Sequence, residues 1–307
     1  VLSRRFRALT YWPSLLLLCL LTDVTSHVDQ EPYLGNWLWG VPLIMAGYAG
    51  VVWVCRQLEP LEQSSGDVGV FSRISWQNLL VMVVMALVVC ALGNSDRTFH
   101  FRMRMEECMV KGNFAEATQV GVKEAATDSS LTMLRVWALS ENHMLGDRLF
   151  SYPLVGGSDA MLPNGASVKL MMADERKLYA HLGVVFIQKM RPRVYLETLH
   201  KAHRATAAAH DWLLCAYLLD RDLNQFVRHL AKYYPINEQL PKHYKEALII
   251  YKHTTSHPLI SYYNNVKEAD YDDFQDLGDK YGNKRERYTA LRDKYGDTYW
   301  FYYYYKR

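Results

Sequence analysis

Long apolar segments fall within the first third of this 307-residue chain, and no further segment of membrane length follows them. They cover about residues 8–24, 36–55 and 76–93, and the last two contain no charged residue. A bilayer core of ~30 Å needs roughly 20 helical residues. Buried core helices are the alternative, but such helices seldom lack a polar face. The sequence therefore predicts a transmembrane region with three spans.

The first segment has a second interpretation as a signal peptide, because Arg4, Arg5 and Arg7 precede a short apolar stretch. No pair of small residues follows Leu21 in the spacing of a cleavage site, which favours a span. The chain also starts at Val1 rather than Met. We therefore expect residues 1–93 to be the end of a longer membrane region.

Loop charges predict the orientation. The stub before the first segment carries arginines, as does the second loop with Arg56 and Arg73, whereas residues 22–35 contain no Lys or Arg. Positive charge marks cytoplasmic loops. The sequence thus predicts an integral protein of the inner or plasma membrane, in contact with the lipid bilayer. Its second domain, residues 94–307, is expected on the extracytoplasmic (periplasmic) side.

Charge and cysteine content exclude some classes of function. Lys and Arg number 35 against 32 Asp and Glu, and the small excess is spread evenly, which does not make a nucleic-acid surface. The five cysteines fit no zinc spacing and no dense disulfide framework. Cys108 and Cys215 lie in helical patterns and are expected to be buried; a disulfide between them is permitted but not indicated.

From Phe99 onward, apolar residues recur with a period near 3.6, which predicts an all-α domain. Asp128 can cap one helix, and Pro192 and Pro241 suit first turns. Short connections predict antiparallel neighbours. The expected helices are 99–111, 113–127, 130–144, 174–190, 192–204, 206–220, 223–234, 241–254, 267–281 and 284–304.

One stretch resembles a tetratricopeptide repeat. In residues 112–117, Gly112 suits the turn between two helices, Phe114 suits packing back on the first helix, and Ala117 permits close approach. Asp128 resembles the acidic residue that closes such a repeat. A looser copy at residues 219–226, ending at 233–235, lacks the turn glycine. No strict repeat period is present, so we expect an irregular α-solenoid.

Taken together, residues 112–117, 131–140 and 145–163 resemble a family of uncharacterised bacterial multi-spanning membrane proteins. Members of that family have a helical, tetratricopeptide-like C-terminal region. The resemblance covers most of the chain and implies membrane spans followed by a helical repeat domain. It implies no activity.

A segment rich in Gly, Pro and Ser interrupts the helical rhythm between Gly146 and Gly165. It is either a surface insertion or a functional loop. Its apolar residues predict that it folds back along the domain, with Phe150 and Tyr152 buried and the tip at Gly156, Gly157 and Ser158 exposed. As an ordered loop on a rigid scaffold, it is the candidate wall of a binding site.

Other clusters favour ordinary helix faces. Glu197, His200 and His203 share one helix face, but a di-metal bundle needs a second such set on a facing helix, so we expect no metal and no cofactor. The acids between Asp270 and Asp279 have helical spacing with apolar residues between them, not the spacing of a calcium loop. The aromatic run 300–305 either packs as a capping helix or meets a partner.

The sequence carries no Ser/His/Asp order, P-loop, G-x-G-x-x-G or HExxH motif, and thus predicts no recognisable enzyme. We expect a membrane-anchored scaffold that presents a protein- or peptide-binding surface outside the cytoplasm. The alternative is the C-terminal part of a multi-spanning glycosyltransferase-like enzyme. In that case Asp23, Asp29 and Glu31, in the first loop, are the visible catalytic candidates.

Overall fold

The computed structural model describes residues 8, 10–15, 37–58, 73–92, 96–122, 124–184 and 190–305. Within these ranges the protein is all-helical, as predicted, and contains no strand. It divides into two compact units, residues 1–96 and 97–307.

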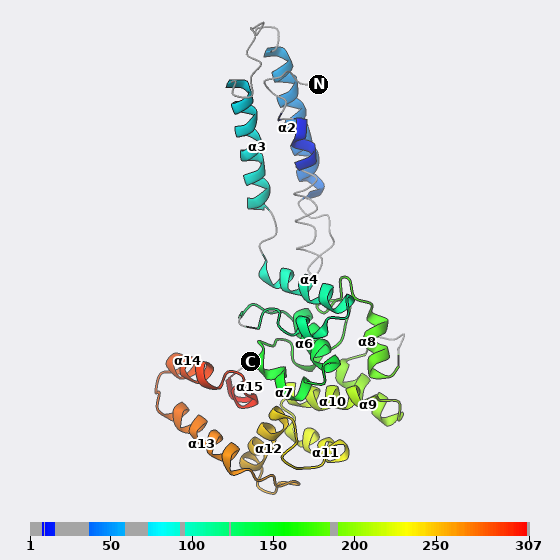
Figure 1. Cartoon of the computed structure of the whole chain (residues 1–307), viewed down its shortest axis with the longest axis vertical. Coiled ribbons are helices and arrows are strands. Elements are labelled where there is room, and N and C mark those ends of the chain that lie inside the picture. Colours follow the sequence, from blue (N-terminus) through cyan, green and yellow to red (C-terminus); the bar gives the residue numbers. More distant parts are fainter. Residues whose placement is uncertain are drawn as a thin grey trace. The chain divides into compact units, whose positions relative to one another are not determined.

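The first unit contains two long helices, α2 (Trp37–Leu58) and α3 (Arg73–Leu92), where the second and third apolar segments lie (Figure 1). Many of their large apolar side chains are exposed, including Trp39, Leu43 and Leu80. Most of the first apolar segment, residues 16–24, lies outside the described residues. Within the described residues, no helix is both long enough and apolar enough to cross a membrane.

The second unit consists of short helices wrapped around a common core (Figure 1). Most of its helices begin and end within a few residues of the predicted limits. They are α4 (Arg97–Val110), α5 (Phe114–Ala117), α6 (Ser129–Glu141), α7 (Leu145–Arg148), α8 (Glu175–Leu182), α9 (Pro192–Lys201), α10 (Ala207–Leu219), α11 (Leu223–Tyr233), α12 (Lys242–Thr254), α13 (Asn265–Asp279), α14 (Lys284–Tyr295) and α15 (Tyr299–Tyr305), with the 3₁₀ turns η3 (Leu149–Ser151) and η4 (Gly157–Ala160).

Local chemistry explains where these helices begin. The Asp128 carboxylate accepts the Leu131 N–H at 2.6 Å, and this confirms the predicted cap of α6. Pro192 occupies the first turn of α9, as predicted, where no backbone N–H is needed. Pro241, in contrast, is the capping residue immediately before α12 rather than a residue within its first turn.

Three predicted helices are shorter than expected. The helix predicted at 174–190 ends at Leu182, because the chain leaves the helix at Gly183, whose φ is +132°. The helix predicted at 284–304 is divided into α14 and α15. The Thr298 hydroxyl donates to the Tyr295 carbonyl at the end of α14 at 2.7 Å and accepts the Phe301 N–H at the start of α15 at 3.3 Å. The helix predicted at 113–127 ends at Ala117, and the chain then turns through Gly121, whose φ of +65° suits glycine. The tetratricopeptide-like pair thus has only a single turn as its second helix.

The core centres on α6 and α10, which are buried on nearly all sides. Such helices are surrounded by other elements instead of lying along one face of a stack. Accordingly, α10 contacts not only its chain neighbours α9 and α11 but also α6, α7, α8 and η4. These contacts are denser than the nearest-neighbour stacking of a regular solenoid, and the predicted solenoid is not confirmed.

Buried charges hold the irregular segments on this core. The Glu106 carboxylate is fully buried and accepts the N–H groups of Met171, Met172 and Ala173 at 2.8, 2.6 and 3.0 Å. Hydrogen bonds from several backbone N–H groups suit a carboxylate that has lost its water. Glu106 therefore fixes the chain just before α8.

Arg135, on α6, fixes two other segments of the chain to the core. Its guanidinium donates to the carbonyl of Pro153 at 2.5 Å and to that of Gly121 at 3.4 Å, with the Tyr152 ring beside it. Burial lowers the pKa of Arg135 to about 10, so it stays positively charged at neutral pH. The charge compensates these carbonyl dipoles inside the core.

Ala117 gives a test of the packing at the repeat-like turn. It is fully buried, and Phe114 nearby contacts the Trp137 ring at a centroid distance of 6.5 Å. Replacing Ala117 with Trp should overpack this junction and lower the free energy of unfolding by about 1–3 kcal/mol. Urea denaturation of the full chain in detergent measures it. The exposed Lys111→Trp is the matched control and should leave stability unchanged.

Candidate functional site

The predicted loop lies against the core, but it does not expose the residues chosen for binding. Phe150 and Tyr152 are buried, as predicted. The Phe150 ring packs on Tyr299 and Tyr302 at centroid distances of 4.8 Å, and the Tyr152 hydroxyl donates to the Thr118 carbonyl at 2.8 Å. Both side chains therefore hold the loop in place and present almost no surface to a ligand.

The prediction of an exposed tip was wrong at Ser158. This residue is buried, and its N–H and hydroxyl donate to the Asp220 carboxylate at 3.1 and 2.8 Å. Gly156 is exposed and Gly157 half-buried. Both have positive φ, and a Cβ on Gly156 would lie 2.7 Å from that of Ala160. The glycines thus permit a tight, fixed turn.

A cavity with a volume of about 810 Å³ lies elsewhere, between α9, α10 and α11. Ligand sites commonly measure roughly 300–1,000 Å³. Each helix contributes residues three or four positions apart, which places them on one helix face. The lining residues are Arg193, Glu197, His200 and Lys201 from α9, His203 and Ala205 from the next loop, His210, Leu213 and Tyr217 from α10, and Gln225, His229, Lys232 and Tyr233 from α11.

Aromatic and imidazole rings form much of the cavity wall. His210 stacks on Tyr233 at a centroid distance of 4.1 Å, and His200 lies 5.1 Å from His210. On the other side, Tyr217 lies 5.1 Å from His229. The rings bring several proton-accepting nitrogens to a single cavity.

The cavity's arginine is already engaged. Arg193 forms ion pairs with Asp222 at 2.7 Å, with Glu197 at 3.2 Å and with Asp220 at 3.5 Å. Its guanidinium also lies over the Tyr217 ring. These carboxylates neutralise Arg193 and fix its position, so it acts mainly as a structural part of the wall.

The cavity's lysines differ from Arg193. Lys201 and Lys232 are exposed, and neither forms an ion pair with any described residue. Their charges remain available to a bound group, at the end of flexible side chains.

Burial lowers the pKa of His200 and of His210 from the ordinary value of histidine. At His200, repulsion from His210, His229 and Lys232 acts in the same direction; at His210, the nearby Asp211 opposes it. Both rings are therefore neutral at pH 7 and gain charge only in acid. Burial also raises the pKa of Tyr217, which keeps its hydroxyl protonated.

The run of Glu197, His200 and His203 lines this cavity, which the sequence did not predict. Glu197 accepts hydrogen bonds from Arg193 and Tyr217, both at 3.2 Å. Throughout the described ranges, no three His, Cys, Asp or Glu side chains come close enough to hold a metal ion. That these residues bind no metal in the native protein stays a prediction.

The contributions of α10 and α11 were missed by sequence reasoning. His210 and Tyr217 are polar or aromatic residues within a strongly apolar helix, separated by seven positions. His229 and Lys232 lie on the polar side of α11. Polar or aromatic residues on helix faces that meet would have indicated the cavity. Recognising them requires knowing which helices pack together.

Three other predictions have outcomes. On α13 the acids at 270, 272, 273, 276 and 279 are exposed or half-buried while Tyr271 and Phe274 are buried, which confirms an ordinary amphipathic helix. The aromatic run packs: Trp300 and Phe301 are buried. Cys108 and Cys215 are buried free thiols. The glycosyltransferase candidates Asp23, Asp29 and Glu31 lie outside the described residues.

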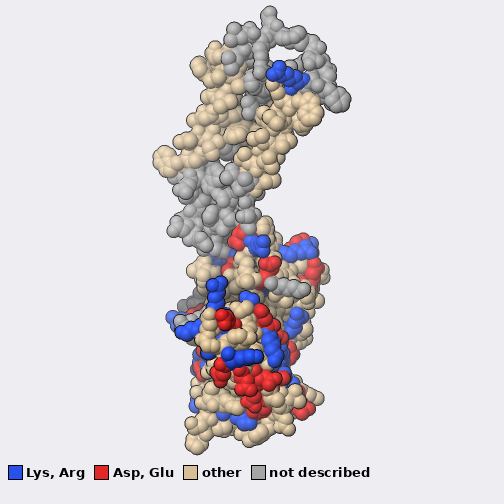
Figure 2. Space-filling view, turned by 90° about the vertical axis from the view of Figure 1, so that its left-hand side faces the viewer, with Lys and Arg blue, Asp and Glu red and all other residues tan. Residues whose placement is uncertain are grey.

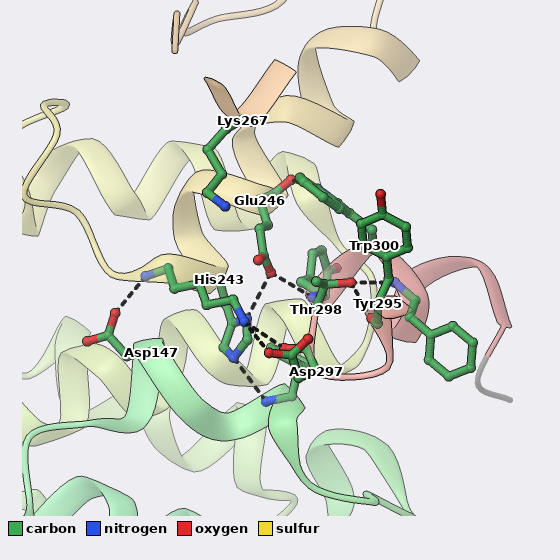
Figure 3. Close-up of polar contacts among 12 residues, drawn as sticks. Asp147, His243, Glu246, Lys267, Tyr295, Asp297, Thr298 and Trp300 are labelled. Atoms are coloured by element: carbon green, nitrogen blue, oxygen red, sulfur yellow. Dashed lines mark hydrogen bonds and ion pairs between the residues drawn. The ribbon is translucent and has the colours of Figure 1, made fainter. Parts of the chain in front are cut away.

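A second polar cluster is structural rather than open to ligands (Figure 3). His243 and Glu246 are fully buried on α12, with His243 Nδ1 2.9 Å from the Glu246 carboxylate. The Tyr299 N–H donates to the same carboxylate at 2.7 Å, and the Phe150 N–H donates to His243 Nε2 at 3.3 Å. The cluster therefore joins α12 to α15 and to the irregular segment after α7.

The cavity falls within the part of the chain that matches a protein-family model. No curated protein and no solved structure matches the chain. Residues 185–306, which include every residue that lines the cavity, match a Family of unknown function (DUF6057).

Proposed function

We propose that this chain is a membrane-anchored binding protein, whose helical domain holds a segment of a protein partner in the cavity between α9, α10 and α11. The observation that carries the proposal is the cavity itself. It combines a ligand-sized volume with polar and aromatic side chains from three helices and lysines that lack ion pairs within the described chain.

The surfaces of the two units support a membrane anchor. Figure 2 shows that the described surface of residues 1–96 is almost free of charge, whereas both signs of charge cover the face of residues 97–307 that is in view. Trp39 and Leu43 on α2 are 78% and 74% exposed, and Leu80 on α3 is 66% exposed. Exposed apolar area of this kind is typical of a surface that contacts lipid or another apolar partner.

The proposal includes a helical-repeat arrangement of the domain. Consecutive helices α9, α10, α11 and α12 each contact the next, as in stacked helix pairs. In such an array the space between neighbouring helices is rigidly framed, which suits a binding site.

The orientation gives a testable prediction. The arginines before the first apolar segment and their absence from residues 22–35 support an extracytoplasmic location for residues 94–307. A reporter fused after Arg307 that is active only in the cytoplasm should give no signal, and one active only outside should give full signal. The reverse pattern would show that the domain faces the cytoplasm.

The binding site is tested with two variants on α11. Gln225→Trp places an indole into the cavity, whereas Arg228→Trp adds the same group at an exposed position that does not line it. Affinity purification of the full chain in mild detergent should recover a partner with the wild type and with Arg228→Trp. Loss with Gln225→Trp alone supports the proposal; equal recovery with both variants rules the cavity out as the site.

A further inference from the structure

We infer that the cavity takes the carboxylates of an acidic peptide segment, and that acidification strengthens this binding by charging His200 and His210. The inference rests on the proposed function, because it names the chemistry of the bound segment. It follows from the orientation of the imidazoles, from the uncompensated lysines and from the repulsion among these groups.

The imidazoles are oriented by the backbone. His200 Nδ1 lies 2.7 Å from the Leu196 carbonyl, and His229 Nδ1 lies 2.9 Å from that of Gln225. A carbonyl only accepts, so Nδ1 carries the hydrogen in both rings, and at His200 the nitrogen left to gain a proton is Nε2. His200 Nε2 is buried and has no hydrogen-bond partner among the described residues. Protonation would turn it into a donor that needs an acceptor.

Two lysines of the cavity can interact with an anion at neutral pH. Glu197 is held by Arg193, whereas Lys201 and Lys232 are free of ion pairs within the described residues. Glu197 shares Arg193 with Asp220 and Asp222, so the two lysines are the fixed charges of the cavity that have no ion-pair partner among the described residues. A carboxylate seated near the lysines would form charge-assisted hydrogen bonds with them.

Titratable groups on every facing element determine the sign of the pH effect. They are Arg193, Glu197, His200 and Lys201 on α9, His203 in the following loop, His210, Asp211 and Tyr217 on α10, Asp220 and Asp222 between α10 and α11, and His229, Lys232 and Tyr233 on α11. Burial is the largest cause of the lowered pKa of His200; the hydrogen bond to the Leu196 carbonyl opposes it, and charge repulsion from His210, His229 and Lys232 adds to it. A bound carboxylate offsets that repulsion and makes protonation easier. By linkage, protonation then strengthens binding, so the affinity must rise as the pH falls.

The test uses a labelled hexaglutamate peptide and the full chain in non-ionic detergent. Glutamate has an ordinary pKa of about 4.3, so the probe keeps its charge between pH 8 and pH 5.5 and any change reports the protein. Fluorescence anisotropy should show about tenfold tighter binding at pH 5.5, the effect expected from a few added charges at a partly hydrated site. Hexaglutamine should not bind at either pH. An affinity that is the same at both pH values overturns the inference.

Variants assign the effect to the cavity. His200→Gln and His210→Gln should each reduce the gain on acidification several-fold, while Lys201→Gln with Lys232→Gln should weaken binding at both pH values. His257→Gln, at an exposed position outside the cavity, is the matched control and should behave as wild type. Melting temperatures at both pH values show whether each variant is folded. A gain on acidification that persists in folded His200→Gln/His210→Gln contradicts the assignment.

The inference and the proposed function fail in different ways. If hexaglutamate binds equally well to Gln225→Trp, its site is not the cavity and the inference is wrong, whereas the proposed function is judged by partner recovery. If partner recovery depends on the cavity but hexaglutamate does not bind, the function stands and the acidic ligand is wrong. Tighter binding of inorganic sulfate than of hexaglutamate would equally overturn the choice of a carboxylate peptide.

Discussion

Replacing Glu246 with Ala should lower the free energy of unfolding by about 3–5 kcal/mol, one of the two largest single-residue effects expected in this protein. The substitution leaves the Tyr299 N–H and the His243 Nδ1 without an acceptor at positions that water does not reach. Each stranded donor costs about 1–3 kcal/mol, and the vacated space adds to this. Urea denaturation of the full chain in detergent, followed by circular dichroism, measures the change.

The control is Glu246→Gln, which keeps an acceptor oxygen and nearly the same volume. It should retain most of the stability that Ala loses, since the amide oxygen can accept from Tyr299. Equal destabilisation by Gln and Ala would show that the charge of Glu246, and not its hydrogen bonds, matters most. A change of less than about 1 kcal/mol in Glu246→Ala would contradict the assignment of this cluster as the link between α12 and α15.

Trp300→Ala should cost a similar amount, about 3–5 kcal/mol, because it removes a large side chain from a packed core. Trp300 is 1% exposed, lies 5.4 Å from the Tyr271 ring between centroids, and donates its indole N–H to the Glu246 carbonyl at 3.0 Å. The loss is measured in the same way. Tyr263→Ala is the control, because this tyrosine is 72% exposed and its removal should change stability little.

Together these two variants test an extended structural unit. Residues in one hydrogen-bonded network do not act independently, so Glu246→Ala and Trp300→Ala should destabilise less in combination than the sum of their separate effects. Additive effects would indicate that α15 is held by separate contacts rather than by a connected cluster.

Elements with strong local signals were predictable from sequence. Asp128 and Pro192 mark helix starts through chemistry that acts within a few residues, and the structure has both where expected. The amphipathic pattern of α13 likewise places Tyr271 and Phe274 inside. Such signals depend on neighbours along the chain and need no knowledge of the tertiary fold.

Features that depend on distant segments were not predictable. After Ala117 the chain turns through Gly121, and the carbonyl of Gly121 accepts a hydrogen bond from Arg135 on the next helix. Ser158 is buried because Asp220, far along the sequence, accepts its hydroxyl. The composition of a Gly-Gly-Ser tip predicts exposure. The hydrogen bonds from Ser158 to Asp220 bury it instead, and the sequence does not show that the two residues meet.

In the candidate site, too, local features were predictable and contacts between distant segments were not. Glu197, His200 and His203 were recognised as one helix face, because their spacing reveals it. Their cavity partners on α10 and α11 were not recognised, because nothing local indicates that His210 or His229 meets that face. Which helix faces meet is determined by packing of the whole core, and packing is also what lowers the pKa of His200.

The position of α15 in chain order has a consequence for synthesis. This helix covers Phe150 and the buried end of α12, yet it follows both in the chain. Until residues 299–305 have left the ribosome, the apolar surfaces that Tyr299 and Trp300 will cover stay open to water. The nascent chain therefore exposes an apolar surface until synthesis ends. Exposed apolar surface of this kind is bound by chaperones and favours association with neighbouring chains.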